Sequence, residues 1–387
     1  MRIITKTVWI LSLVSLFADI SSELLYPVIP VYLKEIGFSV LWIGLLEGLA
    51  NFTAGISKGY FGKLSDEKGV RLPFVKTGYL LSAISKPMLA IFTFKTWVFF
   101  ARTLDRLGKG LRTAPRDALL SQEASPATKA RVFGFHRSLD TAGAMIGPSL
   151  ALLFLYFYPG QYKTIFYLAF IPGLISVLLI YILREKPQPV STLGKGNFFS
   201  FFRYWKIAGP EYKKLVTGLL FFELFNSSDI FLLLVTREVT GSDLLTIAAY
   251  VFYNLVYAAA SYPLGSLADK WGMKTVYTLG LTVFAIVYGS FAFQPSATVI
   301  FILFFIYGLY SAATEGVTRA WITNIAHETN TATAVGFYTS CQSICALLAS
   351  IVAGFIWTSA GSQYTFLITA MAVVLAIIYF LLIRTRN

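Results

Sequence analysis

The chain has 387 residues, of which 56% are hydrophobic and 13% are charged, and its formal net charge is +13. Because a soluble globular domain carries about 25% charged residues, this composition excludes an ordinary water-soluble protein and indicates one that lies in a lipid bilayer. The two cysteines, Cys341 and Cys345, form no disulfide framework of the kind found in small secreted proteins.

Twelve apolar stretches follow one another along the chain, each close to the roughly 20 residues that cross about 30 Å of hydrocarbon. They predict an all-α membrane protein with twelve transmembrane helices. The predicted spans are residues 7–32, 39–61, 73–94, 97–120, 128–156, 164–183, 215–235, 244–268, 275–293, 299–325, 332–357 and 366–383. The first span is not read as a cleavable signal peptide, because it carries Asp19 and Glu23 and lacks a small-residue cleavage site.

Lysine and arginine are distributed unequally between the predicted loops. The cytoplasmic segments hold 18 of the 32 basic residues, whereas the outer loops hold four, which are Lys34, Lys95, Lys163 and Arg237. Since basic residues concentrate on the cytoplasmic side of membrane proteins, we expect both termini in the cytoplasm and the chain in the inner membrane. This placement accounts for the positive charge without a nucleic-acid partner.

The predicted spans contain ionisable side chains, which are expensive to bury in hydrocarbon and are therefore candidates for function. Asp19 and Glu23 lie one turn apart on one face of the first span, and Pro27 and Pro30 beyond them are expected to free backbone carbonyls. The lesser candidates in the second and third spans are Glu47, Asn51 and Lys86.

The fourth span carries a continuous polar stripe. At 100° per residue, its members fall within about 120° of arc. They are Arg102, Asp105, Arg106, Lys109, Arg112 and Arg116. Five cations against one acid leave the stripe positive, so it requires counter-charges, an aqueous cavity or an anionic group of a substrate.

The fifth span places small residues at Gly134, Gly143 and Gly147, followed by Pro148, a spacing that lets two helices pack closely. In the same span Arg137 and Asp140 are expected to supply one pair of opposite charges. In the tenth span Glu315 and Arg319 lie one turn apart and are expected to neutralise each other.

The longest non-apolar stretch, residues 185–214, divides the chain into domains 1–184 and 215–387 and is predicted to be a cytoplasmic linker. Within it, residues 198–206 mix aromatic and basic side chains, as a short helix at the lipid headgroups does. We expect this segment to be a plain membrane anchor.

The two halves of the chain repeat. The turn at residues 62–71 recurs at residues 265–274, an offset of 203. Similar offsets relate Asp19 to Glu223 and Asn51 to Asn254. The repeat predicts two six-helix bundles related by pseudo-two-fold symmetry, with a binding site near the middle of the membrane.

On these motifs the chain resembles the major facilitator superfamily over its full length. The two turns resemble the family's loop signature G-x-L-A-D-x-x-G-x-[KR]. The glycine string of the fifth span is similar to an element found in exporters that exchange substrate against protons, although Ala151 and Leu152 stand where that element ends in a glycine pair. The resemblance implies secondary active transport by alternating access, with export as the direction.

The resemblance also implies roles for the residues singled out above. The proton-coupling candidates are Asp19, Glu23, Glu223, Asp229 and Asp140. The substrate-binding candidates are Arg102, Asp105, Arg106, Lys109, Asn226, Arg137, Glu47, Asn51 and Glu315. The gate candidates are Gly62, Asp66, Gly69, Arg71, Arg112, Arg116, Asp117, Gly265, Asp269 and Gly272, and we expect salt bridges from Arg112, Arg116 and Asp117 around Asp66. Each signature Asp is expected to cap a helix N-terminus, and each Gly to permit a tight turn.

These expectations favour a monomeric exporter of a small organic anion or zwitterion, coupled to protons and without a cofactor. The alternative is an exporter of metal ions or metal chelates, for which the acidic first and seventh spans and Cys341 argue, although no His-rich or Cys-rich cluster accompanies them. A non-transporting membrane sensor would need a soluble domain to carry its signal. No loop of the form G-x-x-x-x-G-K-[ST] supports an ATP-driven pump or an enzyme.

Overall fold

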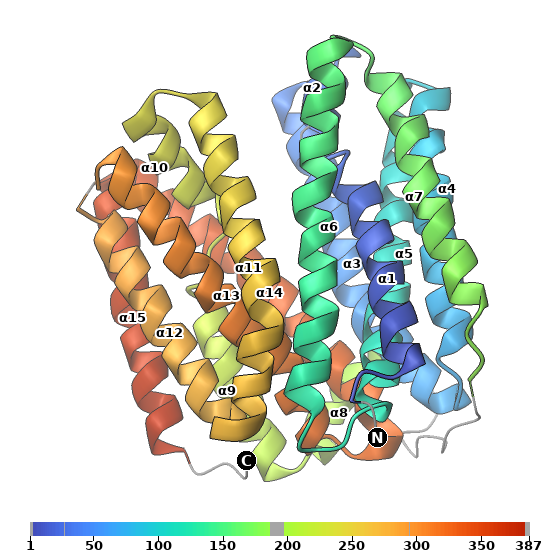
Figure 1. Cartoon of the computed structure of the whole chain (residues 1–387), viewed down its shortest axis with the longest axis vertical. Helices are drawn as coiled ribbons and strands as arrows, with labels where there is room; N and C mark the ends of the chain where they lie inside the picture. The colour runs from blue at the N-terminus through green and yellow to red at the C-terminus, as the bar shows by residue number, and fades with distance from the viewer. Residues whose placement is uncertain (1–2, 27, 186–196, 294, 384–387) are drawn as a thin grey trace. The chain divides into compact units, whose positions relative to one another are not determined.

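The structure is a computed structural model that describes residues 3–26, 28–185, 197–293 and 295–383, and every regular element within them is helical (Figure 1). The helices of the N-terminal half are α1 (Lys6–Glu23), α2 (Val28–Glu35), α3 (Val40–Lys68), α4 (Leu72–Ile91), α5 (Lys95–Gln122), α6 (Lys129–Phe157) and α7 (Tyr162–Tyr181). Those that follow are η1 (Phe198–Arg203), α8 (Tyr204–Ile207), α9 (Pro210–Glu223), α10 (Ile230–Thr240), α11 (Asp243–Trp271), α12 (Met273–Phe291), α13 (Ala297–Ile325), η2 (Glu328–Asn330), α14 (Thr331–Ala360) and α15 (Ser362–Leu382).

The predicted all-α architecture is confirmed. Seven helical segments of the described chain are long and apolar enough to cross a membrane by length and composition. They are Lys129–Phe157, Tyr162–Tyr181, Leu244–Trp271, Met273–Phe291, Ala297–Ile325, Glu328–Ala360 and Ser362–Leu382. The first and seventh predicted spans are each built from two shorter helices, α1 with α2 and α9 with α10.

The two spans that consist of two helices each have the same kind of residue at the break. The helix before each break ends on a glutamate, Glu23 in α1 and Glu223 in α9. A helix end leaves backbone groups without intrahelical partners, and a membrane protein tolerates such groups where they face protein or a water-filled cavity. Of the two prolines expected to interrupt the first span, Pro27 lies outside the described residues, and Pro30 stands within α2.

The chain forms two compact units that do not follow its two halves strictly. Unit 1 comprises residues 1–123, 139–207 and 326–340, and unit 2 comprises residues 124–138, 208–325 and 341–387. The start of α14 therefore belongs to unit 1, and the start of α6 belongs to unit 2. The expected linker falls largely in unit 1, although its residues 186–196 lie outside the described part of the chain.

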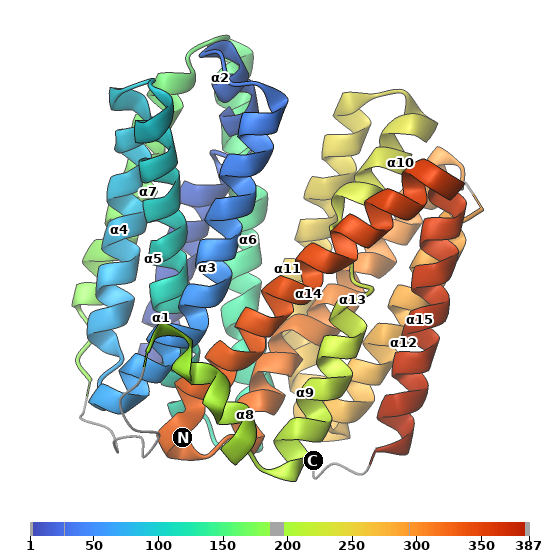
Figure 2. The same cartoon turned by 180° about the vertical axis from the view of Figure 1, so that it is seen from behind.

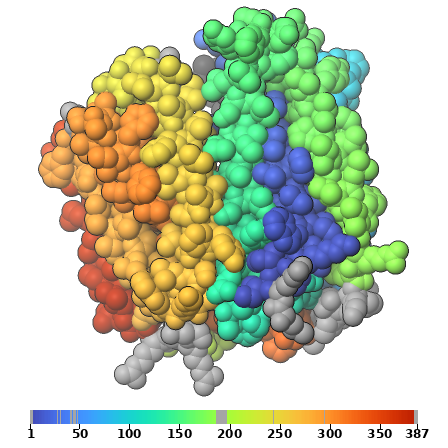
Figure 3. Space-filling model, viewed as in Figure 1, coloured from blue at the N-terminus to red at the C-terminus, as the bar shows by residue number. Residues whose placement is uncertain are grey.

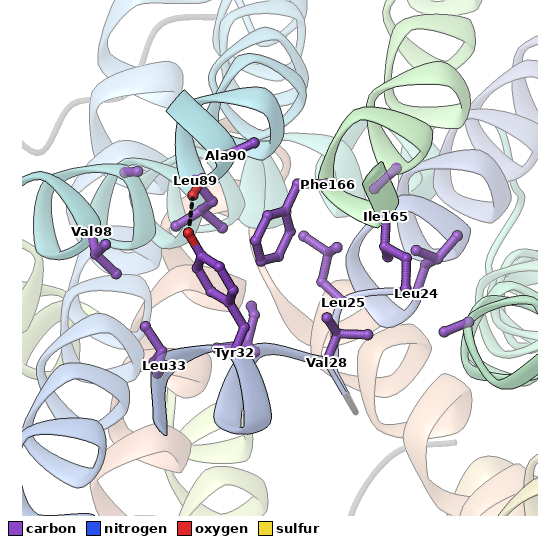
Figure 4. Close-up of a cluster of buried hydrophobic side chains, with 14 of the residues drawn as sticks. Leu24, Leu25, Val28, Tyr32, Leu33, Leu89, Ala90, Val98, Ile165 and Phe166 are labelled. Carbon is purple, nitrogen blue, oxygen red and sulfur yellow. Dashed lines mark hydrogen bonds between the residues drawn. The ribbon is translucent and has the colours of Figure 1, made fainter. Parts of the chain in front are cut away.

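A cluster of buried apolar side chains holds the broken first span of unit 1 in place (Figure 4). Tyr32 of α2 packs edge-on against Phe166 of α7, with ring centroids 4.9 Å apart. Its hydroxyl donates a hydrogen bond to the carbonyl oxygen of Leu89 in α4 at 3.3 Å. Leu25 and Val28, on either side of the break, are fully buried in the same cluster. The chain beyond the break is thereby fixed to two neighbouring helices.

The linker helices η1 and α8 pack on the protein (Figure 2). Phe201 is fully buried beneath Gly59 of α3, where an added Cβ would lie 2.4 Å from its ring. Trp205 stacks on Phe337 of α14, with ring centroids 5.6 Å apart. Phe199 is 58% exposed. The interpretation of this segment as a plain anchor is therefore wrong in part, because one side of it is buried between α3 and the start of α14.

Candidate functional site

The polar stripe of α5 is anchored to α4 in unit 1. Asp105 accepts from Lys86 Nζ at 2.6 Å and from Arg102 Nη1 at 3.3 Å, and all three side chains are buried. The helices can approach this closely because a Cβ at Gly108 would lie 2.6 Å from the carbonyl oxygen of Gly78. Lys86 therefore adds a further cation to the stripe. Asp105, the one acid of the stripe, is shared between Lys86 and Arg102.

The cytoplasmic end of the stripe was predicted to form salt bridges with Asp66, but it does not contact Asp66. Arg112 donates to Ser82 Oγ at 2.6 Å, and its guanidinium lies over the ring of Tyr79, 4.4 Å from the centroid. Arg116 pairs with Asp117 at 2.9 Å. The expected salt bridges from these residues to Asp66 are wrong, because α4 and α5 supply nearer partners.

A carboxyl cluster lies where α6 packs on α1 in unit 1. Asp140 accepts a hydrogen bond from Ser15, and a Cβ added at Gly143 of α6 would lie 2.9 Å from Asp19 Cβ. Asp140 belongs to unit 1 and Arg137 to unit 2, and the expected pairing of the two within α6 stays a prediction.

In unit 2 the acids of the seventh span are held by neutral donors. Glu223 accepts from Gln342 Nε2 at 2.7 Å and from Asn226 Nδ2 at 3.2 Å. Asp229 accepts from the Tyr307 hydroxyl at 2.6 Å. Gln342 and Tyr307 were not predicted; the only sequence signal for Gln342 is an uncharged amide within an apolar span.

Arg137 belongs to unit 2 and pairs with Glu315 of α13 at 3.1 Å. Its Nε also donates to the Tyr257 hydroxyl. Arg319 lies near Gln342, with its Nη2 3.5 Å from the amide oxygen. The predicted neutralisation of Glu315 by Arg319 is therefore wrong, because α6 brings a different arginine to the carboxylate.

A cluster of tyrosines lies beside Asp229 in unit 2. Tyr253 lies 5.1 Å from Tyr307 and 6.0 Å from Tyr257, measured between ring centroids, and Tyr307 lies 5.2 Å from Tyr310. The aromatic content of the sequence did not reveal this cluster, because the four rings come from two helices. Tyrosine offers both an apolar face and a hydroxyl group, so the cluster supplies neutral hydrogen-bonding groups beside Asp229.

The signature Asp66 in unit 1 caps the start of α14. Its Oδ2 accepts from the Thr333 backbone nitrogen at 2.7 Å and from Thr333 Oγ1 at 2.9 Å, and its Oδ1 pairs with Arg71 at 3.1 Å. Asp66 lies beyond the end of the predicted second span. Burial raises the pKa of its carboxyl to about 6, against the opposing effects of Arg71 and Thr333.

The equivalent Asp269 in unit 2 caps the start of α6. It accepts from the backbone nitrogens of Ala130 at 3.0 Å and Arg131 at 2.9 Å. Negative charge at a helix N-terminus interacts favourably with the helix dipole and with unpaired backbone N–H groups. Both signature turns thus use an Asp to hold the first turn of another helix.

The signature glycines allow these contacts. A Cβ at Gly62 would lie 2.4 Å from the carbonyl oxygen of Ala332, and one at Gly265 would lie 2.3 Å from that of Ala130. Gly134 meets Ser261 in the same way, at 2.4 Å. Gly69 and Gly272 have φ of +62° and +91°, which favour glycine.

The remaining glycines of α6 pack against α1 in unit 1. A Cβ at Gly143 would lie 2.6 Å from the carbonyl oxygen of Leu16, and one at Gly147 would lie 2.7 Å from the Leu24 nitrogen. Pro148 stands inside α6 directly after Gly147. In Figure 3, α1 in blue lies against the green length of α6.

Four other candidate residues stand apart from these clusters. The side chain of Glu47 lies outside the described residues, and Asn51 is exposed on α3. Cys341 and Cys345 are free thiols on α14. In the described part of the chain, no group of three or more His, Cys, Asp or Glu side chains is arranged to hold a metal ion.

Comparisons with known proteins cover nearly the whole chain. The family model described as Major Facilitator Superfamily matches residues 11–253 and 215–387. An uncharacterized MFS-type transporter of Methanocaldococcus jannaschii is 35% identical over 375 residues, which is 95% of this chain and 92% of that protein. A multi-drug resistance efflux pump PmrA homolog of Lactococcus lactis is 23% identical and covers 94% of this chain and 92% of its own length.

Among solved structures, the human organic anion transporter MFSD10 superposes with a TM-score of 0.81 at 16% identity, covering 97% of this chain and 98% of that one. At this identity the likeness concerns the fold. It confirms the predicted twelve-span, two-bundle architecture.

Proposed function

The chain belongs to the major facilitator superfamily of membrane transporters, and on that premise we propose that it exports a small organic anion or zwitterion by proton-coupled alternating access. We place it in the inner membrane as a monomer with both termini in the cytoplasm, as the distribution of basic residues favours. The family and the fold are those of transporters.

The charge balance of α5 and its neighbours is the observation that carries the substrate class. Six cations of α4 and α5 lie in unit 1 within this region, and five acids of unit 1 lie near them. The cations are Lys86, Arg102, Arg106, Lys109, Arg112 and Arg116, and the acids are Asp19, Glu23, Asp105, Asp117 and Asp140. An anionic group would relieve the remaining positive charge. Arg102, Arg106 and Lys109 are the proposed contacts.

Proton coupling is supported by how the acids are held. Asp229 accepts from the Tyr307 hydroxyl group, which brings no positive charge of its own. Such a partner leaves the carboxyl able to gain or lose a proton without breaking an ion pair. Glu223 accepts from the amide groups of Gln342 and Asn226. Asp19 and Asp140 are two further acids of unit 1.

The two capped helix starts support a gate role for the signature turns. Asp66 holds α14 and Asp269 holds α6, each through backbone nitrogens at the first turn. A contact of this kind is either made or lost as a whole, so it suits an element with two discrete arrangements. We propose that these contacts form and break during alternating access.

Export in exchange for protons requires that substrate and proton compete. The ammonium group of a zwitterion can compete with a proton for a carboxylate, whereas a simple anion cannot, so exchange favours a zwitterion. The direction is supported by the glycine string of α6 and by the Lactococcus lactis relative, which is named as an efflux pump. The name of MFSD10 agrees with an anionic group, although its likeness is one of fold.

The test is uptake of a panel of anionic, zwitterionic, neutral and cationic metabolites by inside-out vesicles that contain the full chain. We expect uptake of an anion or zwitterion driven by an acidic vesicle interior, with proton efflux recorded by a pH-sensitive dye. Vesicles without the protein serve as the control. Uptake of simple cations alone, or uptake that ignores the pH gradient, contradicts the proposal.

A further inference from the structure

We propose that the linker segment formed by η1 and α8, residues 198–207, is a strap that holds the start of α14, residues 331–340, against α3 in unit 1. Phe201 holds the strap to α3, and Trp205 holds it to α14. The inference rests on the proposed alternating access, because it adds the linker to the gate contact that Asp66 makes with α14.

The start of α14 packs closely on α3. A Cβ at Gly336 would lie 2.5 Å from the carbonyl oxygen of Lys58. Ser340 Oγ donates to the carbonyl oxygen of Gly55 at 2.7 Å and accepts from the backbone nitrogen of Gly59 at 3.0 Å. Residues 326–340 and α3 belong to the same unit. Because glycine and serine bury little apolar surface, this contact gains from apolar groups that a third segment supplies.

The strap has one face toward the protein. Its buried positions follow one another at spacings of three and four residues, as on one side of a helix. The buried residues are Ser200, Phe201, Tyr204 and Ala208, and the exposed ones are Phe198, Phe199, Phe202, Arg203, Lys206 and Ile207. In Figure 2, the yellow-green η1 and α8 lie at the lower ends of α3 and α14.

Phe201 occupies the space beside a glycine of α3. Its side chain is fully buried, and a Cβ added at Gly59 would overlap its ring. The backbone nitrogen of the same glycine donates to Ser340 of α14. The neighbouring Phe198 lies against Tyr60 of α3, with ring centroids 4.8 Å apart. The strap and α14 therefore contact α3 at the same residue.

The other end of the strap packs on α14. Trp205 stacks on Phe337, with ring centroids 5.6 Å apart and ring planes 17° from parallel. Phe202 lies edge-on to the same ring at 6.0 Å. Phe337 follows Thr333 by one helical turn, and Asp66 caps the backbone nitrogen of Thr333. The strap thus holds both partners of the gate contact at once.

A bridge across two helices favours the state in which both helices lie within its reach. If the start of α14 moves away from α3, the strap can stay with only one of them, and the aromatic rings on its other contact become exposed to water. The strap therefore lowers the free energy of the closed contact relative to the open one. Its strength sets how often the contact opens.

The experiment is amide hydrogen exchange, measured by mass spectrometry on the purified full-length protein without substrate. The peptide of interest covers residues 328–340, which include the capped backbone nitrogen of Thr333. Phe201→Ala should speed its exchange roughly tenfold or more, because the change removes a buried ring and eases local opening. Trp205→Ala should speed it about two- to tenfold. Trp205→Phe keeps a ring on Phe337 and should speed it less.

Phe199→Ala is the matched control, because it makes the same change in the same short helix at a side chain that is 58% exposed. Exchange over residues 328–340 should keep the wild-type rate in this variant. The exchange of α12, in unit 2, should stay unchanged in every variant. Equal acceleration in Phe199→Ala, or acceleration in α12, would show a general loosening of the protein and overturn the strap.

Gly59→Ala tests the strap from the side of α3. Its added methyl group displaces the Phe201 ring and should speed the exchange of residues 328–340 as Phe201→Ala does. The double variant should exchange no faster than Gly59→Ala, because the ring that the methyl group displaces is already absent. Accelerations that add would mean that the two residues act independently and would overturn the role of Phe201.

A wild-type exchange rate over residues 328–340 in either Phe201→Ala or Trp205→Ala overturns the strap. The exchange rate does not depend on transport. If vesicles show no uptake while exchange responds as described, the proposed function fails and the strap stands. If uptake follows the pH gradient while no variant changes the exchange, the strap fails and the function stands.

Discussion

Two acids, Asp105 of unit 1 and Asp229 of unit 2, are stabilised by different means. Asp105 faces the opposite charges of Lys86 and Arg102. Asp229 accepts a hydrogen bond from the hydroxyl group of Tyr307, which is neutral. An ion-paired region responds to an added charge, whereas a carboxyl among neutral donors responds to an added proton. The comparison suggests that unit 1 recognises the substrate's charge and that the seventh span of unit 2 handles a proton.

The largest effect is expected at Asp105. Asp105→Asn leaves Lys86 and Arg102 buried without their shared carboxylate, and removing one partner of a buried ion pair costs about 3 to 5 kcal/mol. We expect a marked loss of thermal stability of the purified protein in detergent. A double variant with Lys86→Met should recover part of the loss. An unchanged unfolding temperature in Asp105→Asn would show that unit 1 does not depend on this ion-paired network.

The next effect concerns Arg106. Losing one partner of a desolvated charge pair costs about 2 to 5 kcal/mol of binding, so Arg106→Ala should weaken an anionic or zwitterionic substrate by tens-fold or more. A neutral analogue should bind as before, and Arg106→Lys should recover binding only in part if the contact is bidentate. Equilibrium binding to the purified protein measures this. Unchanged affinity for the anion would remove α5 from substrate recognition.

A smaller effect is expected at the signature turn of unit 1. Asp66→Asn keeps the size of the side chain but loses the charge that interacts with the start of α14 and with Arg71. We expect turnover to fall several-fold while equilibrium substrate affinity stays near the wild-type value, because the residue does not touch the ligand. Asp269→Asn is the matched variant in unit 2. A loss of affinity at constant turnover would count against the gate role.

The smallest effect is expected from Asn226→Ala. Its amide donates the longer of the two hydrogen bonds to Glu223, at 3.2 Å, while Gln342 supplies the shorter one, at 2.7 Å. A hydrogen bond typically contributes about 0.5 to 1.5 kcal/mol, so gradient-driven transport should change only a few-fold. Gln342→Ala should have the larger effect. The reverse order would mean that the two donors have been ranked wrongly.

The faces of single helices could be predicted from the sequence, but the partners of these faces could not. The stripe of α5 follows from helical periodicity alone, and the two capping aspartates follow from the repeated turns. Pairing is different: Glu315 of α13 pairs with Arg137 of α6 and not with Arg319 of its own helix, because the packing of neighbouring helices decides which side chains meet, and periodicity does not describe that packing. Tyr307 was missed for the same reason, since only packing brings its hydroxyl to Asp229.

The central claim is that charge recognition and proton handling lie with different residues, and one paired measurement tests it. Substrate affinity from counterflow exchange and the rate of pH-gradient-driven transport are measured side by side in proteoliposomes for Arg106→Ala and Glu223→Gln. We predict that Arg106→Ala loses affinity for the charged substrate and keeps its response to the gradient. Glu223→Gln should keep counterflow exchange and lose gradient-driven transport to the level of liposomes without protein. Loss of both properties in both variants, or gradient-driven transport at the wild-type rate in Glu223→Gln, would contradict the account.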